Sequence, residues 1–83
     1  MRAEVSAQLG YSAWLSRDYS QAIKYYTEAL GFGDRLEFLK NRGKVFMATR
    51  QYAEAKNDFA RYLQYKKSDG EVNDLLRRLE AIK

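Results

Sequence analysis

The sequence contains no cysteine, no histidine and no proline, and each absence removes a class of structure or chemistry. Without cysteine, the chain has no disulfide framework and no thiolate that could act as a nucleophile or metal ligand. Without histidine, it lacks the commonest general base and the commonest metal ligand. Because proline is absent as well, no proline interrupts a helix anywhere in the chain.

The remaining polar residues do not form a recognisable catalytic pattern. The chain has no glycine-rich phosphate loop and no paired-carboxylate motif, and its carboxylates fall on solvated faces or at helix caps. We therefore predict no catalytic residue, no cofactor and no metal, and we expect that the protein is not an enzyme.

Long apolar stretches are missing too. No run approaches the roughly 18 residues needed to span a membrane, and no signal peptide opens the chain. With 83 residues, the chain suffices for one small domain whose core is near the lower limit of size. We expect a soluble, cytoplasmic module that does not contact membranes, either free-standing or taken from a longer repeat array.

The net charge of +4 is unevenly distributed along the chain. Residues 1–34 carry three basic and four acidic side chains, whereas residues 35–83 carry twelve basic and seven acidic ones. Such asymmetry is typical of proteins that bind an acidic partner or a nucleic acid. A solvated helical surface rich in lysine would give the same counts, so both interpretations stay open at this point.

A repeat of 33 residues organises the chain. Pairing residues 3–35 with residues 36–68 gives six identities, where ordinary composition gives roughly two by chance. The identical pairs are Glu4/Glu37, Gly10/Gly43, Arg17/Arg50, Tyr19/Tyr52, Ala22/Ala55 and Leu30/Leu63. A period in this range indicates a stacked repeat architecture.

Apolar residues at helical spacing predict five helices separated by short connections. The predicted ranges are 3–16, 19–30, 35–49, 52–65 and 71–82. Links this short force consecutive helices to pack antiparallel, so the first four helices form two hairpins. The last helix has one polar face, which suits the end of a stack. The predicted fold is all-α, an α-α superhelix of antiparallel helical hairpins.

Three sequence pairs predict where helices begin. A short polar residue followed three positions later by Glu or Gln is typical of a capping box. The pairs are Asp18/Gln21, Asp34/Glu37 and Ser68/Glu71.

The two repeat glycines lie inside predicted helices, where each costs about 1 kcal/mol relative to alanine. Their recurrence therefore indicates close packing. We predict that Gly10 faces Ala22 and that Gly43 faces Ala55 on the second helix of each hairpin, which would let the helix axes approach closely. The space between hairpins would be filled by one aromatic residue of each repeat, Tyr26 and Phe59.

These recurring residues resemble the tetratricopeptide repeat, whose pattern runs Leu-Gly and then Tyr, Ala, Phe and Ala at fixed offsets. The first copy matches at Leu9, Gly10, Tyr19, Ala22, Tyr26 and Ala29, and the second at Gly43, Tyr52, Ala55 and Phe59. The chain departs from the pattern at Ser6, Arg42 and Tyr62. The resemblance implies repeat 1 at about 3–35, repeat 2 at about 36–68, and a capping helix at about 71–82.

The resemblance also implies a protein–protein interaction scaffold whose concave groove binds an extended peptide or a helix of a partner. Carried over by position, the groove residues would be Gln8, Tyr11, Trp14, Lys40, Asn41, Lys44, Met47 and Arg77, with Glu4, Ala7, Glu37, Asn73 and Glu80 beside them. Three of these residues, Lys40, Lys44 and Arg77, are cationic and adjacent by this alignment. Together with the aromatic residues they predict that the partner is an acidic peptide with an apolar anchor.

Other interpretations of the same residues remain. Trp14 would serve equally as a packing residue, and Lys40 and Lys44 as solvated side chains. The carboxylate clamp that grips a chaperone's acidic C-terminus is matched only at Asn41, so any co-chaperone likeness is general.

Two alternative functions stay open. The first is RNA or nucleic-acid binding by the basic region, which the scatter of its cations over several helix faces disfavours. The second is a structural role, through weak self-association of an otherwise monomeric domain.

Overall fold

The computed structural model describes residues 3–32 and 36–82, and every regular element in these ranges is a helix. The helices are α1 (Ala3–Leu15), α2 (Tyr19–Gly31), α3 (Leu36–Ala48), α4 (Tyr52–Tyr65) and α5 (Gly70–Ala81). Each predicted helix is present, and its ends differ from the predicted ones by at most one residue. The all-α fold class is therefore confirmed.

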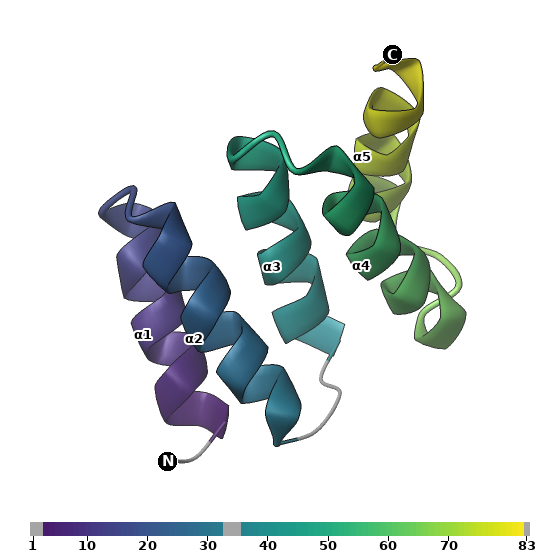
Figure 1. Ribbon diagram of the computed structural model, residues 1–83. Helices are drawn as coiled ribbons and strands as arrows, with labels where there is room; N and C mark the ends of the chain where they lie inside the picture. The colour runs from purple at the N-terminus through teal and green to yellow at the C-terminus, as the bar shows by residue number, and fades with distance from the viewer. Residues whose placement is uncertain (1–2, 33–35, 83) are drawn as a thin grey trace.

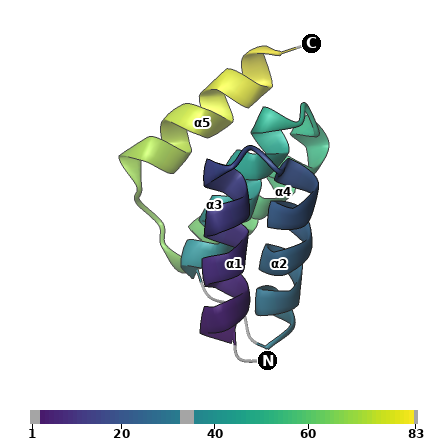
Figure 2. The same ribbon diagram turned by 90° about the vertical axis from the view of Figure 1, so that its left-hand side faces the viewer.

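The helices pack mainly against their neighbours in sequence (Figure 1). α1 packs on α2 and α3 packs on α4, which makes the two expected hairpins, and α2 packs on α3 to join them. α5 packs mainly on α4; it lies apart from the first hairpin (Figure 1) and at an angle to the other helices (Figure 2). Within the described ranges, no helix has the length and apolar character that crossing a membrane requires.

The turn inside each hairpin has the same geometry, built around an arginine. Arg17 and Arg50 both have a left-handed φ of 62°. In the first turn the Asp18 amide donates to Ala13 O at 2.8 Å and the Arg17 amide donates to Trp14 O at 2.9 Å. This pair of bonds is a Schellman motif, which satisfies the last carbonyls of α1. The second turn repeats it, with Gln51 donating to Phe46 O and Arg50 to Met47 O.

Helix starts agree only partly with the capping predictions. The Asp18 side chain accepts from the Gln21 amide at 3.4 Å, as predicted for α2. At α5 the predicted Ser68 is not the cap, because Asp69 accepts from the amides of Glu71 and Val72 instead. The pair beginning at Asp34 lies outside the described residues.

The core consists of two clusters, one between the two hairpins and one between the second hairpin and α5. The first joins Ala22, Tyr26 and Ala29 of α2 to Phe38 and Val45 of α3. The second joins α3 and α4 to the cap, and its buried members are Leu39, Phe46, Ala55, Phe59, Tyr62, Val72 and Leu79. The half-buried Tyr19 and Tyr52 pack at the edge of these clusters.

The nearest neighbours of the repeat glycines are aromatic rings and not the predicted alanines. A Cβ added at Gly10 would lie 3.1 Å from the Tyr26 ring, and one added at Gly43 would lie 2.6 Å from the Phe59 ring. The prediction of close packing was therefore right about the glycines and wrong about their nearest neighbours. Because glycine has no Cβ, an aromatic ring fits against the helix at this position. The ring buries more apolar area in the hairpin than the methyl group of an alanine would.

The departure at Arg42, where the tetratricopeptide pattern has leucine, is explained by a buried ion pair. Arg42 donates to both carboxylate oxygens of Asp58, at 2.8 and 2.7 Å, and Asp58 is only 4% exposed. The same guanidinium donates to Thr27 Oγ1 at 3.2 Å. Arg42 thus connects α3 to both α4 and α2.

Candidate functional site

A cleft of about 570 Å³ lies between the first helices of the two hairpins. α1 and α3 present one face each to this cleft, because the repeat places equivalent residues on equivalent helix faces. The residues that line it are Glu4, Ala7, Gln8, Tyr11, Ser12, Tyr26, Glu37, Phe38 and Asn41. The sequence predicted a groove between these helices, and several of the predicted residues meet there.

The charge of the cleft is opposite to that of the whole chain. Among the described residues, its lining includes the carboxylates of Glu4 and Glu37 but neither lysine nor arginine, although the protein carries a net charge of +4, and Glu4 already has an interaction partner. Tyr11 is half exposed at the rim and packs edge-on against Trp14, with ring centroids 6.5 Å apart. The cleft therefore offers negative charge and an aromatic face.

Tyr26 places a buried hydroxyl in the lining of the cleft. Its side chain is fully buried, and within the described part of the chain its hydroxyl makes no hydrogen bond of good geometry. Burial raises the pKa of Tyr26 to about 12, and Tyr11 adds to the rise, whereas the Asn41 side chain acts in the opposite direction. Asn41 is thus near this hydroxyl, yet the two groups do not make a well-formed hydrogen bond.

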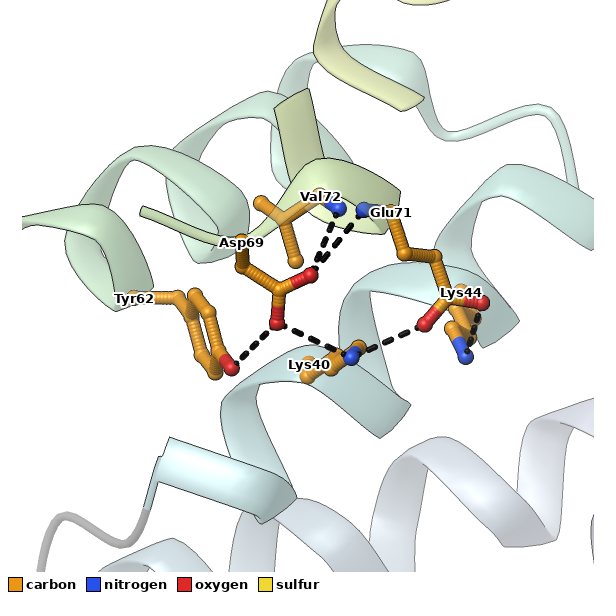
Figure 3. A network of polar contacts seen from close by, with 6 residues as sticks. All are labelled: Lys40, Lys44, Tyr62, Asp69, Glu71 and Val72. Atoms are coloured by element: carbon orange, nitrogen blue, oxygen red, sulfur yellow. Dashed lines mark hydrogen bonds and ion pairs between the residues drawn. The ribbon is translucent and has the colours of Figure 1, made fainter. Parts of the chain in front are cut away.

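The lysines predicted for the groove anchor the capping helix instead (Figure 3). Lys40 Nζ lies 3.0 Å from Asp69 Oδ2 and 2.8 Å from Glu71 Oε1, and Lys44 Nζ lies 3.0 Å from Glu71 Oε2. The Tyr62 hydroxyl donates to Asp69 Oδ2 at 2.6 Å. α3, α4 and the start of α5 are therefore joined by one polar network.

The network shifts the pKa of its members in the directions that favour the ion pairs. Hydrogen bonds from Tyr62 and then Lys40 hold the pKa of Asp69 well below its ordinary value. Lys40 and Lys44 lower the pKa of Glu71, and Glu71, followed by Asp69, raises the pKa of Lys40 despite some burial. Two positive and two negative charges balance in this network, so the predicted positive patch does not form around these lysines.

The eight predicted partner-binding residues thus fall into three groups. Gln8, Tyr11 and Asn41 line the cleft, while Lys40 and Lys44 belong to the network. The other three lie outside the cleft lining. Trp14 and Met47 pack against the core clusters, and Arg77 is highly exposed on α5 near Asp74.

Sequence reasoning missed Ser12, Tyr26 and Phe38 as lining residues. Tyr26 and Phe38 are buried, so their apolar spacing indicated core packing only. The signal that could have identified Tyr26 is Gly10, because the missing Cβ lets the ring sit against α1 below the cleft. A helical-face projection would also have placed Ser12 beside Gln8.

The described residues contain no cluster of three or more acidic, cysteine or histidine side chains arranged to hold a metal ion. The fold and the cleft together define the class of the protein as an all-α repeat of helical hairpins.

Comparison with models of known protein families gives no match to this chain. Among curated proteins, the chain is similar to the heat shock protein sti1 homolog of Schizosaccharomyces pombe, with 33% identity over 67 residues. The match includes 80% of this chain and 11% of the relative. The chain therefore spans about a tenth of the length of the relative that it matches, and the likeness concerns a small part of a longer protein.

Proposed function

We propose that this domain is a protein–protein interaction module of the tetratricopeptide type, and that the cleft between α1 and α3 binds a peptide or a helix of a partner. The observation that carries the proposal is the cleft itself, formed by the first helices of both hairpins and lined by Gln8, Tyr11 and Asn41. The repeated glycine, alanine and aromatic residues in matching helices support it. The likeness to part of a heat shock protein supports a setting among proteins of that kind.

We also propose that the domain binds rather than catalyses, and that it acts inside the cell. The absence of cysteine and histidine from the sequence supports the first statement. The lack of cysteine is also typical of proteins from reducing compartments, because disulfides form in oxidising ones.

We infer the sign of the partner's charge from the site rather than from the whole chain. The sequence predicted an acidic partner from Lys40, Lys44 and Arg77. The two lysines are compensated by Asp69 and Glu71, and the charged side chains among the described lining residues are those of Glu4 and Glu37. An acidic partner would therefore have to bind elsewhere than in this cleft.

The experiment is selection of binders from a displayed library of random peptides, followed by titration of two cleft variants. We expect Tyr11→Ala and Asn41→Ala to weaken binding by roughly fivefold or more each, since each removes a side chain that lines the cleft. Circular dichroism should show unchanged helix content, because neither residue is part of the buried core.

The chain offers matched controls. Tyr65 and Asn57 are exposed on α4 and lie outside the cleft lining, so Tyr65→Ala and Asn57→Ala should leave binding unchanged. If the controls weaken binding as much as the cleft variants do, the partner sits on another face. A library that yields no binder for the intact domain would refute the proposed function.

A further inference from the structure

The lining of the α1–α3 cleft is rich in hydrogen-bond acceptors. Glu4 and Glu37 contribute carboxylates, and Gln8 and Asn41 contribute amide oxygens. Of the residues in 3–32 and 36–82, no lysine or arginine lines the cleft, although the chain as a whole has more basic than acidic residues. A ligand group that only donates hydrogen bonds and carries positive charge would match this set.

The Tyr26 hydroxyl is a second and independent indication of a ligand. A buried hydroxyl without a partner is destabilising, and such groups are rare in native domains. This hydroxyl belongs to a side chain that lines the cleft, and the Asn41 side chain beside it lines the cleft as well, so a donor that enters between these two side chains would satisfy it. Phenylalanine would fill the same space without the unsatisfied group, so packing alone does not explain the tyrosine.

The aromatic rim restricts the shape of the ligand. Tyr11 is 52% exposed and its ring is braced edge-on by Trp14, at an interplanar angle of 85°. A planar guanidinium stacks on such a ring and presents five donors, whereas an ammonium is a compact point charge. Ala7 and Phe38 supply apolar surface for the methylene stem of the side chain.

We infer that the α1–α3 cleft is a receptor for an arginine side chain of the partner, with Glu37 and the Tyr26 hydroxyl as its principal acceptors and Tyr11 as its stacking surface. The inference rests on the proposed function and specifies the partner's chemistry at this site. It assigns a positively charged anchor to a domain whose overall charge suggests the opposite.

The test is a titration of the intact domain with N-acetylargininamide. Binding is measured from the shifts of the backbone amide resonances in nuclear magnetic resonance spectra. We expect shifts at Gln8, Tyr11 and Asn41. The corresponding amide of citrulline has nearly the same shape without the charge, and we expect it to bind roughly tenfold more weakly. The amide of N-acetylglutamate should not shift these resonances.

Two substitutions examine the named acceptors. Glu37→Gln should weaken binding of N-acetylargininamide by roughly fivefold. Glu28→Gln changes the same charge on the exposed surface of α2 and should leave it unaltered. Tyr26→Phe should weaken binding by a similar factor while the melting temperature stays equal or rises, because the variant removes an unsatisfied buried group.

The inference is overturned if citrulline binds as well as arginine, if Glu28→Gln weakens binding as much as Glu37→Gln, or if Tyr26→Phe leaves arginine binding unchanged. Its failure is distinct from failure of the proposed function. Library peptides that require Tyr11 but show no arginine preference would refute the inference alone. Binding of N-acetylargininamide without any peptide binder would refute the proposed function alone.

Discussion

Gly43 shows how one missing methyl group controls the packing of a hairpin. An added Cβ would lie 2.6 Å from Phe59 Cε1, closer than real carbon atoms approach. The equivalent distance at Gly10 is 3.1 Å to Tyr26 Cδ2, which a small shift of the ring would relieve. An added methyl group is therefore tolerated less well at Gly43 than at Gly10, although the two glycines occupy the same repeat position.

We predict that Gly43→Ala destabilises the domain by about 1–3 kcal/mol, because overpacking of a core outweighs the gain of about 1 kcal/mol in helix propensity. Gly10→Ala should be milder, close to neutral, because its clash is smaller. Chemical denaturation followed by circular dichroism measures both. Equal effects of the two substitutions would contradict this difference in the space beside the two glycines.

At the scale of elements, Arg42 makes a polar contact between helices at a position where the tetratricopeptide pattern has an apolar leucine. Its guanidinium pairs with the buried Asp58 through two hydrogen bonds, so α3 and α4 are held in one register. A buried ion pair contributes little net stability, but removing one partner leaves a buried charge without compensation. We therefore expect the pair to act more on the specificity of packing than on total stability.

We predict that Arg42→Leu, which introduces the leucine of the tetratricopeptide pattern, destabilises the domain by about 3 kcal/mol because Asp58 is left unpaired. The double variant Arg42→Leu/Asp58→Leu should recover most of this loss. A double-mutant cycle of unfolding free energies provides the measurement. Additive losses in the cycle would show that the two side chains are not coupled.

At the scale of the whole molecule, the capping helix depends on the polar network as well as on its apolar face. Val72 and Leu79 bury the apolar side of α5, and Asp69 and Glu71 attach its first turn to Lys40 and Lys44. The pKa values of Asp69 and Glu71 are lower in the folded protein than in the unfolded chain, so their ionised carboxylates stabilise the fold at neutral pH. That contribution is present above the ordinary values of 3.8 for Asp69 and 4.5 for Glu71, and it is lost as the pH falls below them.

We predict that the melting temperature falls as the pH is lowered from about 5 to about 2, and that Asp69→Asn flattens this dependence while lowering stability at neutral pH. Lys40 has a raised pKa, so its contribution persists at neutral pH and is lost only above about 10.5. Thermal melts at a series of pH values provide the measurement. Asp74→Asn is the control, because its carboxylate is 65% exposed and should leave the acid limb unchanged. An acid limb that Asp69→Asn does not alter would exclude this network as its cause.

The sequence by itself determined the elements and their order. The 33-residue period, the apolar spacing and the short links predicted five helices in two hairpins and a cap, because these properties depend on local periodicity and chain length. The resemblance to the tetratricopeptide repeat also predicted Gln8, Tyr11 and Asn41 as groove residues, and all three line the cleft.

Only the tertiary structure decided the chemistry of that groove. Whether Lys40 and Lys44 are available to a partner depends on Asp69 and Glu71, which lie far along the sequence and reach them only when α5 packs. The unsatisfied hydroxyl of Tyr26 likewise depends on how its ring sits against Gly10 of the facing helix. Charge compensation and hydrogen bonding act over a few ångströms, so they are fixed by the packed chain and not by the spacing of its residues.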